Sequence, residues 1–223
     1  MEIKEYNGQT LTDRKFDKLM VDFLLDEPFF ASIVMNLKKI KTYDIPTAGV
    51  TIKDNSFVLY WNPDFVSKLP KIKFFGLMKH ECYHLIYQHV VARKQDPHTL
   101  WNIATDLAIN SLISESYLPD GGLIPGKRLK EETSEDLPQE LIERNNKLSE
   151  FLASLPKCKA SEWYMEKLKE NKEVAEAFKA AFGDGSAAGF DVHIDSDGSL
   201  SDSDIEIMKG KLKDIIKKSA GKA

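Results

Sequence analysis

His80-Glu81-Cys82-Tyr83-His84 lies near the middle of the chain, inside a run of apolar residues at helical spacing. This spacing predicts one long helix over residues 69 to about 93, with its apolar stripe facing the core. On a helix, residues four apart point about 40° apart and lie one turn along, so His80 and His84 can share one metal ion. Glu81 follows the first histidine directly, where a carboxylate can take a proton from a metal-bound water. The stretch therefore predicts two zinc ligands and a general base on one helix.

A catalytic zinc needs a third protein ligand, and two residues compete for that position. On a helix that continues past residue 89, His89 is turned about 140° from His84, onto the side of Cys82. The residues between His84 and His89 include no glycine that would turn the chain back. We therefore interpret His89 as a core histidine or a partner of a ligand, and as the weaker candidate ligand.

Asp106 is the stronger candidate. A second helix is predicted from Asp96-Pro97 to about residue 114, and polar residues recur on it every four positions, at Asn102, Asp106 and Asn110. A polar stripe on an otherwise apolar helix needs partners. If this helix packs against the first, Asp106 can complete the metal shell, and Asn110 can hydrogen-bond a ligand ring. Asn102 lies on the same stripe, and the alternative is an exposed face of a surface helix.

The rest of the sequence predicts an α+β fold that is mostly helical, with a small β-hairpin before the histidine helix and a ligand helix after it. Residues 10–25 and 29–41 have helical periodicity and predict an opening helical hairpin, with a cap at Thr12 or Asp13. Residues 48–62 are rich in β-branched and aromatic residues and predict the β-hairpin. Further helices are predicted at 137–155, 160–181 and 205–218.

The composition indicates an ordinary soluble protein. Of 223 residues, 42% are hydrophobic and 30% charged, and the net charge is −4 with no separate basic block, so binding to nucleic acid or to a membrane is not expected. We expect neither a secretory signal nor a membrane span, and two cysteines cannot form a disulfide framework, so a reducing cytoplasm is the expected location. The predicted organisation is one domain over residues 1–182. A flexible Gly-, Ser- and Asp-rich segment with a terminal amphipathic helix follows over 183–223.

Two stretches carry a resemblance to a known family. They are Lys79-His80-Glu81-Cys82-Tyr83-His84-Leu85 and Trp101-Asn102-Ile103-Ala104-Thr105-Asp106-Leu107-Ala108-Ile109-Asn110. Over residues 62–125 the chain resembles the metallopeptidase domain of bacteria and phages that often precedes a von Willebrand factor A-like domain. The resemblance implies a zincin-type fold and zinc peptidase activity.

More distantly, the sequence is similar to the gluzincins, in which a downstream helix supplies a glutamate ligand and, four residues later, an acidic residue that supports a ligand. Asp106 and Asn110 stand in those two places. The sequence departs from that pattern because aspartate is shorter than glutamate and Asn110 is neutral.

One stretch near the end fits another metal motif. Asp197-Gly198-Ser199-Leu200-Ser201 has the D-x-S-x-S spacing of a von Willebrand A metal site, but the chain after it is too short for such a domain. We prefer helix capping by Ser201 and Asp204 as its explanation.

The predicted reaction is hydrolysis of a peptide bond in a protein or peptide substrate, with Glu81 moving the proton. Residues 57–61 are the predicted edge strand that pairs with extended substrate. His89, Arg93, Tyr83 and Tyr117 all stay open as residues that stabilise the oxyanion. One alternative is a non-catalytic interaction, assembly or regulatory protein of the same fold, including one encoded by a phage and active in the host cytoplasm. A deformylase-like hydrolase is disfavoured because no cysteine precedes Cys82.

Overall fold

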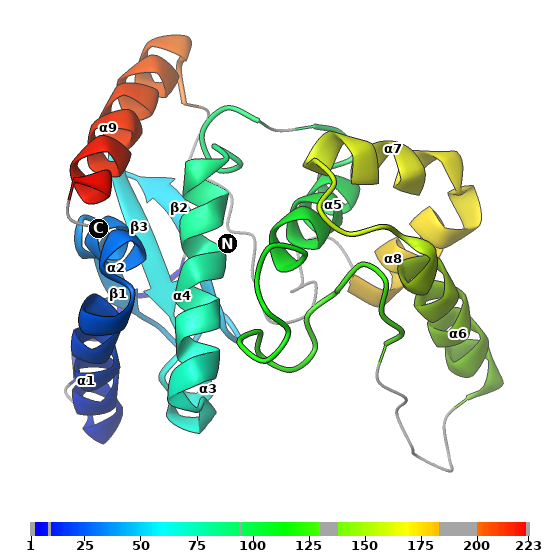
Figure 1. The fold of residues 1–223 in the computed structure, drawn as a ribbon, viewed down its shortest axis with the longest axis horizontal. Coiled ribbons are helices and arrows are strands. Elements are labelled where there is room, and N and C mark those ends of the chain that lie inside the picture. Colours follow the sequence, from blue (N-terminus) through cyan, green and yellow to red (C-terminus); the bar gives the residue numbers. More distant parts are fainter. Residues whose placement is uncertain (1–2, 9, 94, 130–137, 183–199, 222–223) are drawn as a thin grey trace.

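The computed structural model describes residues 3–8, 10–93, 95–129, 138–182 and 200–221. These residues form many helices and one small sheet, so the predicted α+β, mostly helical class is confirmed. Figure 1 shows two parts side by side, with α4 and α5 facing each other where the parts meet. We call them the sheet lobe and the helical lobe. The sheet lobe contains α1 (Leu11–Asp26), α2 (Pro28–Met35), β1 (Lys38–Lys41), β2 (Ala48–Lys53), β3 (Ser56–Trp61), α3 (Pro63–Lys68), α4 (Lys71–Ile86) and α9 (Asp202–Ala220). The helical lobe contains α5 (His98–Asn110), α6 (Gln139–Ser154), α7 (Ser161–Glu170) and α8 (Lys172–Phe182).

The chain enters α1 through a capping box. Thr10 is the N-cap, and the Asp13 carboxylate accepts the backbone N–H of Thr10. The predicted cap at Thr12 or Asp13 was therefore wrong by a few residues. Asp13 acts from the third helical position, where a carboxylate reaches back to the cap, and it also forms an ion pair with the buried Lys41.

The second predicted helix is shorter than its apolar periodicity indicated. It ends at Met35, and Lys38–Lys41 forms β1, which pairs in parallel with β3. Ile40 packs in a small cluster with Ile45, Val58 and Tyr60. Pairing with β3 satisfies the backbone N–H and C=O groups of this segment, and its side chains pack on the sheet. A tertiary contact therefore overrides the local helical pattern.

The predicted β-hairpin is confirmed as β2 and β3. Asp54 and Asn55 at its tip have φ values of 48° and 52°, the left-handed pair that a type I′ turn requires. The strand order is β1-β3-β2, so β3 is the central strand and is paired on both sides. The expectation that residues 57–61 form an edge strand for substrate is wrong, because both hydrogen-bonding edges of β3 are already used.

Two hydrophobic clusters lie on either side of the junction. The sheet-lobe cluster joins α1, α2, one face of the sheet, α4 and α9, and the helical-lobe cluster joins α5 to α8. Helix α5 belongs to both, since Ile109 packs in the first cluster while Ile103 and Leu107 pack in the second. The contact between α4 and α5 therefore has an apolar core behind each helix, which fixes the two helices relative to each other.

A close approach tightens α4 one turn before His80. A Cβ on Gly76 would lie 1.9 Å from the backbone oxygen of Tyr117. Only glycine leaves room for that segment, which follows α5 in the chain. Glycine is otherwise unfavourable inside a helix, so here close packing outweighs helix propensity.

The later helices confirm the sequence predictions with one correction. The helix predicted over 160–181 is two helices that meet at Asn171, whose side-chain oxygen accepts the N–H of Val174 at 3.2 Å and so begins α8. The last helix is present as α9. Its Met208 and Leu212 pack in the sheet-lobe cluster.

The predicted cap of α9 is confirmed. The Ser201 hydroxyl accepts the N–H of Asp204 at 3.2 Å, and the Asp204 carboxylate accepts the N–H of Ser201 at 3.1 Å. Asp197, Gly198 and Ser199 of the D-x-S-x-S stretch lie outside the described residues.

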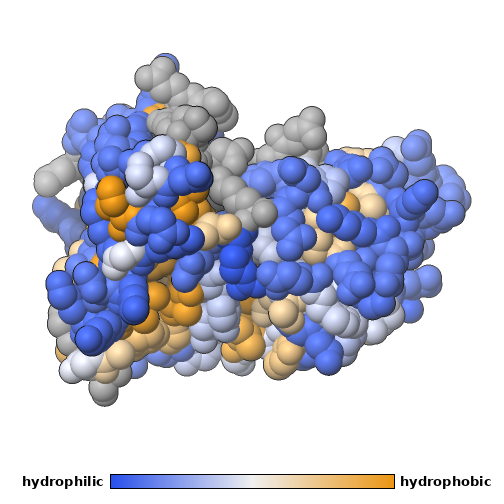
Figure 2. Space-filling view, turned by 90° about the horizontal axis from the view of Figure 1, so that it is seen from above, coloured by the Kyte–Doolittle hydropathy of each residue, from blue (hydrophilic) through white to orange (hydrophobic). Residues whose placement is uncertain are grey.

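The two lobes also differ on the surface. Seen from above (Figure 2), the helical lobe is mostly covered by polar side chains, whereas the larger apolar areas lie over the sheet lobe. Ion pairs such as Lys167 with Glu170 and Lys179 with Glu176 run along the helical-lobe surface. None of the helices in the described ranges has the length and apolar character needed to cross a membrane.

Candidate metal centre

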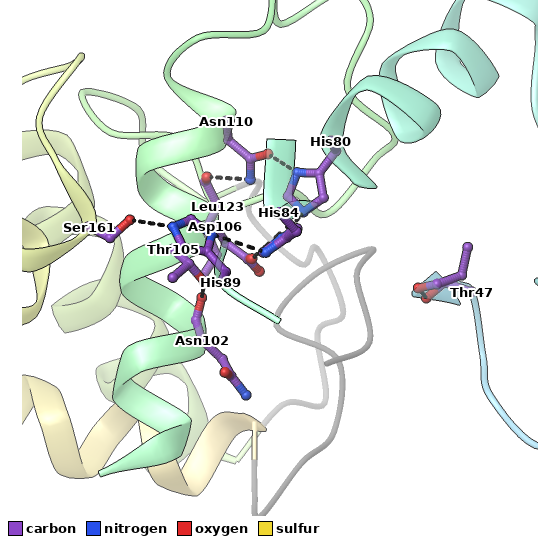
Figure 3. Close-up of polar contacts among 11 residues, drawn as sticks. Thr47, His80, His84, His89, Asn102, Thr105, Asp106, Asn110, Leu123 and Ser161 are labelled. Atoms are coloured by element: carbon purple, nitrogen blue, oxygen red, sulfur yellow. Dashed lines mark hydrogen bonds and ion pairs between the residues drawn. The ribbon is translucent and has the colours of Figure 1, made fainter. Parts of the chain in front are cut away.

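Helix α4 places His80 and His84 one turn apart on the side that faces α5. Their exposed fractions are 0% and 2%, and the two Nε2 atoms lie 2.9 Å apart. Figure 3 shows both rings pointing toward α5. The geometry expected for histidines four residues apart is therefore present, with two ring nitrogens directed at one point.

Helix α5 brings Asp106 to the same point. Its Oδ1 lies 3.7 Å from His80 Nε2 and 3.4 Å from His84 Nε2, and its exposed fraction is 0%. The three residues form a buried group whose ligand atoms all lie within 4.8 Å of one another. A group that spans two helices in this way can hold a metal ion.

The separations fit zinc. Ligand atoms about 2.0–2.1 Å from a tetrahedral zinc lie roughly 3.3 Å from each other. The observed separations of 2.9, 3.4 and 3.7 Å fall on both sides of that value. Two imidazoles and one carboxylate are also a donor set that zinc binds in hydrolytic enzymes, where a fourth position is left for water.

Asn110 contacts the outer nitrogen of His80. Its Oδ1 lies 2.9 Å from His80 Nδ1, and its Nδ2 donates to the backbone oxygen of Leu123 at 2.9 Å. Because a carbonyl oxygen only accepts, the amide must turn Nδ2 to Leu123 and Oδ1 to the ring. His80 Nδ1 therefore donates to Asn110, and Nε2, the atom that faces Asp106, is the ring nitrogen left to bind a metal ion.

The structure corrects the predicted course of the chain after His84. Helix α4 ends at Ile86 rather than near residue 93, and Gln88 adopts a left-handed conformation with φ of 60°. The backbone N–H of His89 then donates to the His84 oxygen at 2.9 Å. The turn that was thought to need glycine is made by glutamine, so the 140° argument does not apply.

His89 consequently lies beside His84. The two Nδ1 atoms are 3.3 Å apart, while His89 Nε2 lies 3.2 Å from the Ser161 hydroxyl. His89 thus contacts the outer edge of the His84 ring, on the opposite side from the nitrogen that faces His80.

Asn102 shares the stripe of Asp106 but is not brought to the histidines of α4. Its side-chain amide lies 3.4 Å from Nδ1 of His98, one turn earlier on α5. In Figure 3 it points away from the His80 and His84 rings. Of the three residues of the polar stripe, the structure brings Asp106 and Asn110 to the histidines of α4 and leaves Asn102 apart from them.

Glu81 and Cys82 follow His80 on α4, and both are buried. The Cys82 thiol lies 3.5 Å from the Phe30 carbonyl oxygen, within the core of the sheet lobe. Burial, with a smaller contribution from the Glu81 charge, raises the pKa of Cys82 well above its usual value. Cys82 is therefore a core thiol. The other cysteine, Cys158, is exposed beside Ser111, so neither belongs to the metal group.

Two of the residues considered for the oxyanion are engaged elsewhere. Arg93 forms a two-pronged ion pair with Glu162, with Nε 3.1 Å from Oε1 and Nη2 2.5 Å from Oε2. The Lys79 ammonium nitrogen lies over the Tyr117 ring, 5.1 Å from the ring centroid. Tyr83 is half-buried and stacks on Tyr87 with ring centroids 5.8 Å apart.

Some residues around the centre were not found from the sequence. Ser161 begins α7 and contacts His89, and Trp101 donates from its ring nitrogen to the Arg93 oxygen at 2.7 Å. Ser161 lies in a charged segment with no motif, and its partner is 72 residues away in the chain. Local pattern carries no signal of a contact at that separation.

The buried group of His80, His84 and Asp106 and a family match together support a metal-dependent hydrolase. The chain belongs to the family described as "Putative metallopeptidase domain", whose profile matches residues 13–215. It is also similar to an uncharacterized protein of Thermotoga maritima, with 25% identity over 101 residues, which cover 44% of this chain and 25% of that protein. The match thus spans about a quarter of the relative's length. No solved structure matches the chain.

Proposed function

We propose that this protein is a zinc-dependent peptidase of the zincin type, in which Glu81 is the general base. The observation that carries the proposal is the buried group of His80, His84 and Asp106, with separations of 2.9, 3.4 and 3.7 Å between ligand atoms. Membership of the metallopeptidase family supports the same reaction class.

Three atoms would hold the ion: Nε2 of His80, Nε2 of His84 and Oδ1 of Asp106. Bound zinc supplies a Lewis acid and lowers the pKa of its water to about 7. Asn110 supports this arrangement by holding the His80 ring, since Leu123 in turn holds the Asn110 amide. His89 and Asn102 are assigned no ligand role, because His89 contacts the outer nitrogen of His84 and the Ser161 hydroxyl, and Asn102 contacts His98.

Two observations support Glu81 as the proposed general base. It follows His80 on α4, and its exposed fraction is 1%. In the proposed reaction Glu81 accepts the proton of the attacking water and gives it to the leaving amine. Little bulk water competes for the carboxylate at a buried position, which strengthens its interaction with the reacting groups.

The substrate class is protein or peptide, and the proposed location is a reducing cytoplasm, where both cysteines are thiols as in the structure. The division into a domain over residues 1–182 and an appended segment over 183–223 stays a prediction.

Zinc content and a single substitution test the proposal. We expect purified protein to carry about one zinc per chain by mass spectrometry and to cleave unfolded protein or a peptide library. Glu81→Gln should keep the zinc and lose cleavage by roughly 10²–10⁴-fold, because it removes the base and leaves the ligands in place. Protein without zinc, or a variant that cleaves like the parent, would contradict the proposal and favour the non-catalytic interaction protein.

A further inference from the structure

Each candidate zinc histidine has a protein partner on its outer nitrogen, and the two partners differ. His80 contacts an amide oxygen on α5, whereas His84 contacts a second imidazole, His89, at 3.3 Å. His89 in turn contacts the hydroxyl of Ser161 at 3.2 Å, and Ser161 is 3% exposed. The support of His84 therefore extends through two residues into the first turn of α7.

The donors and acceptors in the series His84, His89 and Ser161 follow from what metal binding requires of His84. To bind an ion through Nε2, His84 must carry its proton on Nδ1 and donate it. His89 Nδ1, which lies opposite, must then be the acceptor. A neutral imidazole has one N–H, so the proton of His89 is on Nε2, the atom that faces Ser161. The Ser161 hydroxyl lies 3.2 Å from that nitrogen and can accept its proton, which stabilises the form of His89 that His84 requires.

We propose that Ser161 is a positioning residue of the metal centre and acts through His89 on the orientation and proton position of His84. The inference rests on the proposed zinc site and adds a residue to its support. It also makes the helical lobe responsible for both histidines of α4, through Asn110 for His80 and through Ser161 for His84.

The turn that carries His89 is held from the same side. The Trp101 ring lies edge-on to the His89 ring, with centroids 5.9 Å apart, and its nitrogen donates to the Arg93 oxygen at 2.7 Å. Arg93 pairs with Glu162, the residue after Ser161. Helices α5 and α7 therefore hold the backbone of this turn, and the Ser161 hydroxyl contacts the ring that the turn presents.

Zinc affinity of Ser161→Ala provides the first test. The matched control is Ser149→Ala, because Ser149 is also buried in the helical lobe, at 7% exposure, and its hydroxyl accepts a backbone N–H from Leu129 at 3.0 Å. Competition with a chromophoric chelator should show about tenfold weaker zinc binding for Ser161→Ala, at the lower end of outer-shell effects, and unchanged binding for the control. Equal affinities for Ser161→Ala and the parent, or an equal loss in the control, would overturn the proposal.

Nitrogen-15 NMR of the histidine rings in the zinc-loaded protein provides a second test, one that a purely structural role would not move. The parent should show His89 protonated on Nε2 and His84 on Nδ1, and Ser161→Ala should shift His89 toward a mixture of both forms. A parent in which His89 carries its proton on Nδ1 would refute the role of Ser161 even if zinc is bound. A parent that binds no zinc would instead remove the proposed function and, with it, this inference.

Discussion

The sheet lobe and the helical lobe position their residues of the candidate metal centre in different ways. The sheet lobe presents His80, Glu81 and His84 from neighbouring positions of one helix, α4, whose apolar side is packed in the core. The helical lobe presents Asp106 and Asn110 from α5, and Ser161 of α7 contacts His89, which in turn contacts His84. The positions of the α4 residues are thus set by helix geometry, whereas those of the helical-lobe residues depend on how several helices pack.

The difference indicates where substitutions should act. A change in the α4 residues alters the chemistry directly, because spacing on the helix already aligns them. A change in the helical lobe alters the site only if it disturbs a contact across the junction. Zinc affinity should therefore separate residues that contact the proposed ligands across the junction from residues that only pack in a core.

The largest effect is expected for Asp106→Asn, which removes the only charged ligand proposed from the helical lobe and keeps its shape. Zinc affinity should fall by more than the roughly 10–100-fold typical of outer partners, because a direct ligand is weakened. Chelator competition measures the affinity, and circular dichroism checks that the fold is kept. Unchanged affinity would mean that α4 holds the ion without the helical lobe.

A large loss of stability is expected for Gly76→Ala, at the junction beside α4. The added Cβ would lie 1.9 Å from the Tyr117 oxygen, so the backbone must move, at a cost of about 3 kcal/mol or more in the free energy of unfolding. The control is Gly210→Ala in α9, where nothing lies within 4 Å of the new Cβ and a gain of roughly 0.5–1 kcal/mol is expected. Urea unfolding measures both, and effects of the same sign would contradict the close approach.

A smaller effect on zinc is expected for Asn110→Ala, which leaves His80 Nδ1 without its acceptor. Zinc affinity should fall by roughly 10–100-fold. Asn102→Ala is the matched control on the same stripe of α5, and it should bind zinc like the parent because its amide contacts His98. If both variants lose affinity equally, the effect comes from α5 as a whole rather than from the hydrogen bond to His80.

The smallest effect is expected for Arg93→Met, which breaks the ion pair with Glu162. Burial raises the pKa of Glu162, but the hydrogen bond from Arg93, a backbone hydrogen bond at Glu162 and the Arg93 charge together outweigh this and hold the pKa below its usual value of 4.5. A lowered carboxyl pKa stabilises the folded state above the unfolded pKa, and the contribution is lost as the pH falls through the folded value. Both side chains are partly exposed, so the loss at neutral pH should be under about 1 kcal/mol. Urea unfolding of parent and variant at pH 7 and near pH 3 should show this difference shrinking in acid, and a constant difference would contradict the pairing.

The sequence alone was sufficient for the features that depend on neighbouring residues. The spacing of His80 and His84, the helix that carries Asp106 and Asn110, the β2–β3 hairpin and the cap at Ser201 all follow from local rules of periodicity, turns and capping. Asp106 could be chosen because a polar stripe on an apolar helix has to find a partner. Its distance from the histidines could not be calculated from spacing, since it depends on the packing of α4 against α5.

Other features depend on contacts between distant parts of the chain and were missed or misjudged. The strand β1 exists because β3 is beside it, so its helix-like periodicity misled the prediction. The helix α4 ends at Ile86 with Gln88 in a left-handed conformation, although no glycine marks the position. The turn after it is held by Trp101, Ser161 and Glu162. Such contacts compensate for unfavourable local conformations, which is why His89 lies against His84 when helical geometry placed it on the far side.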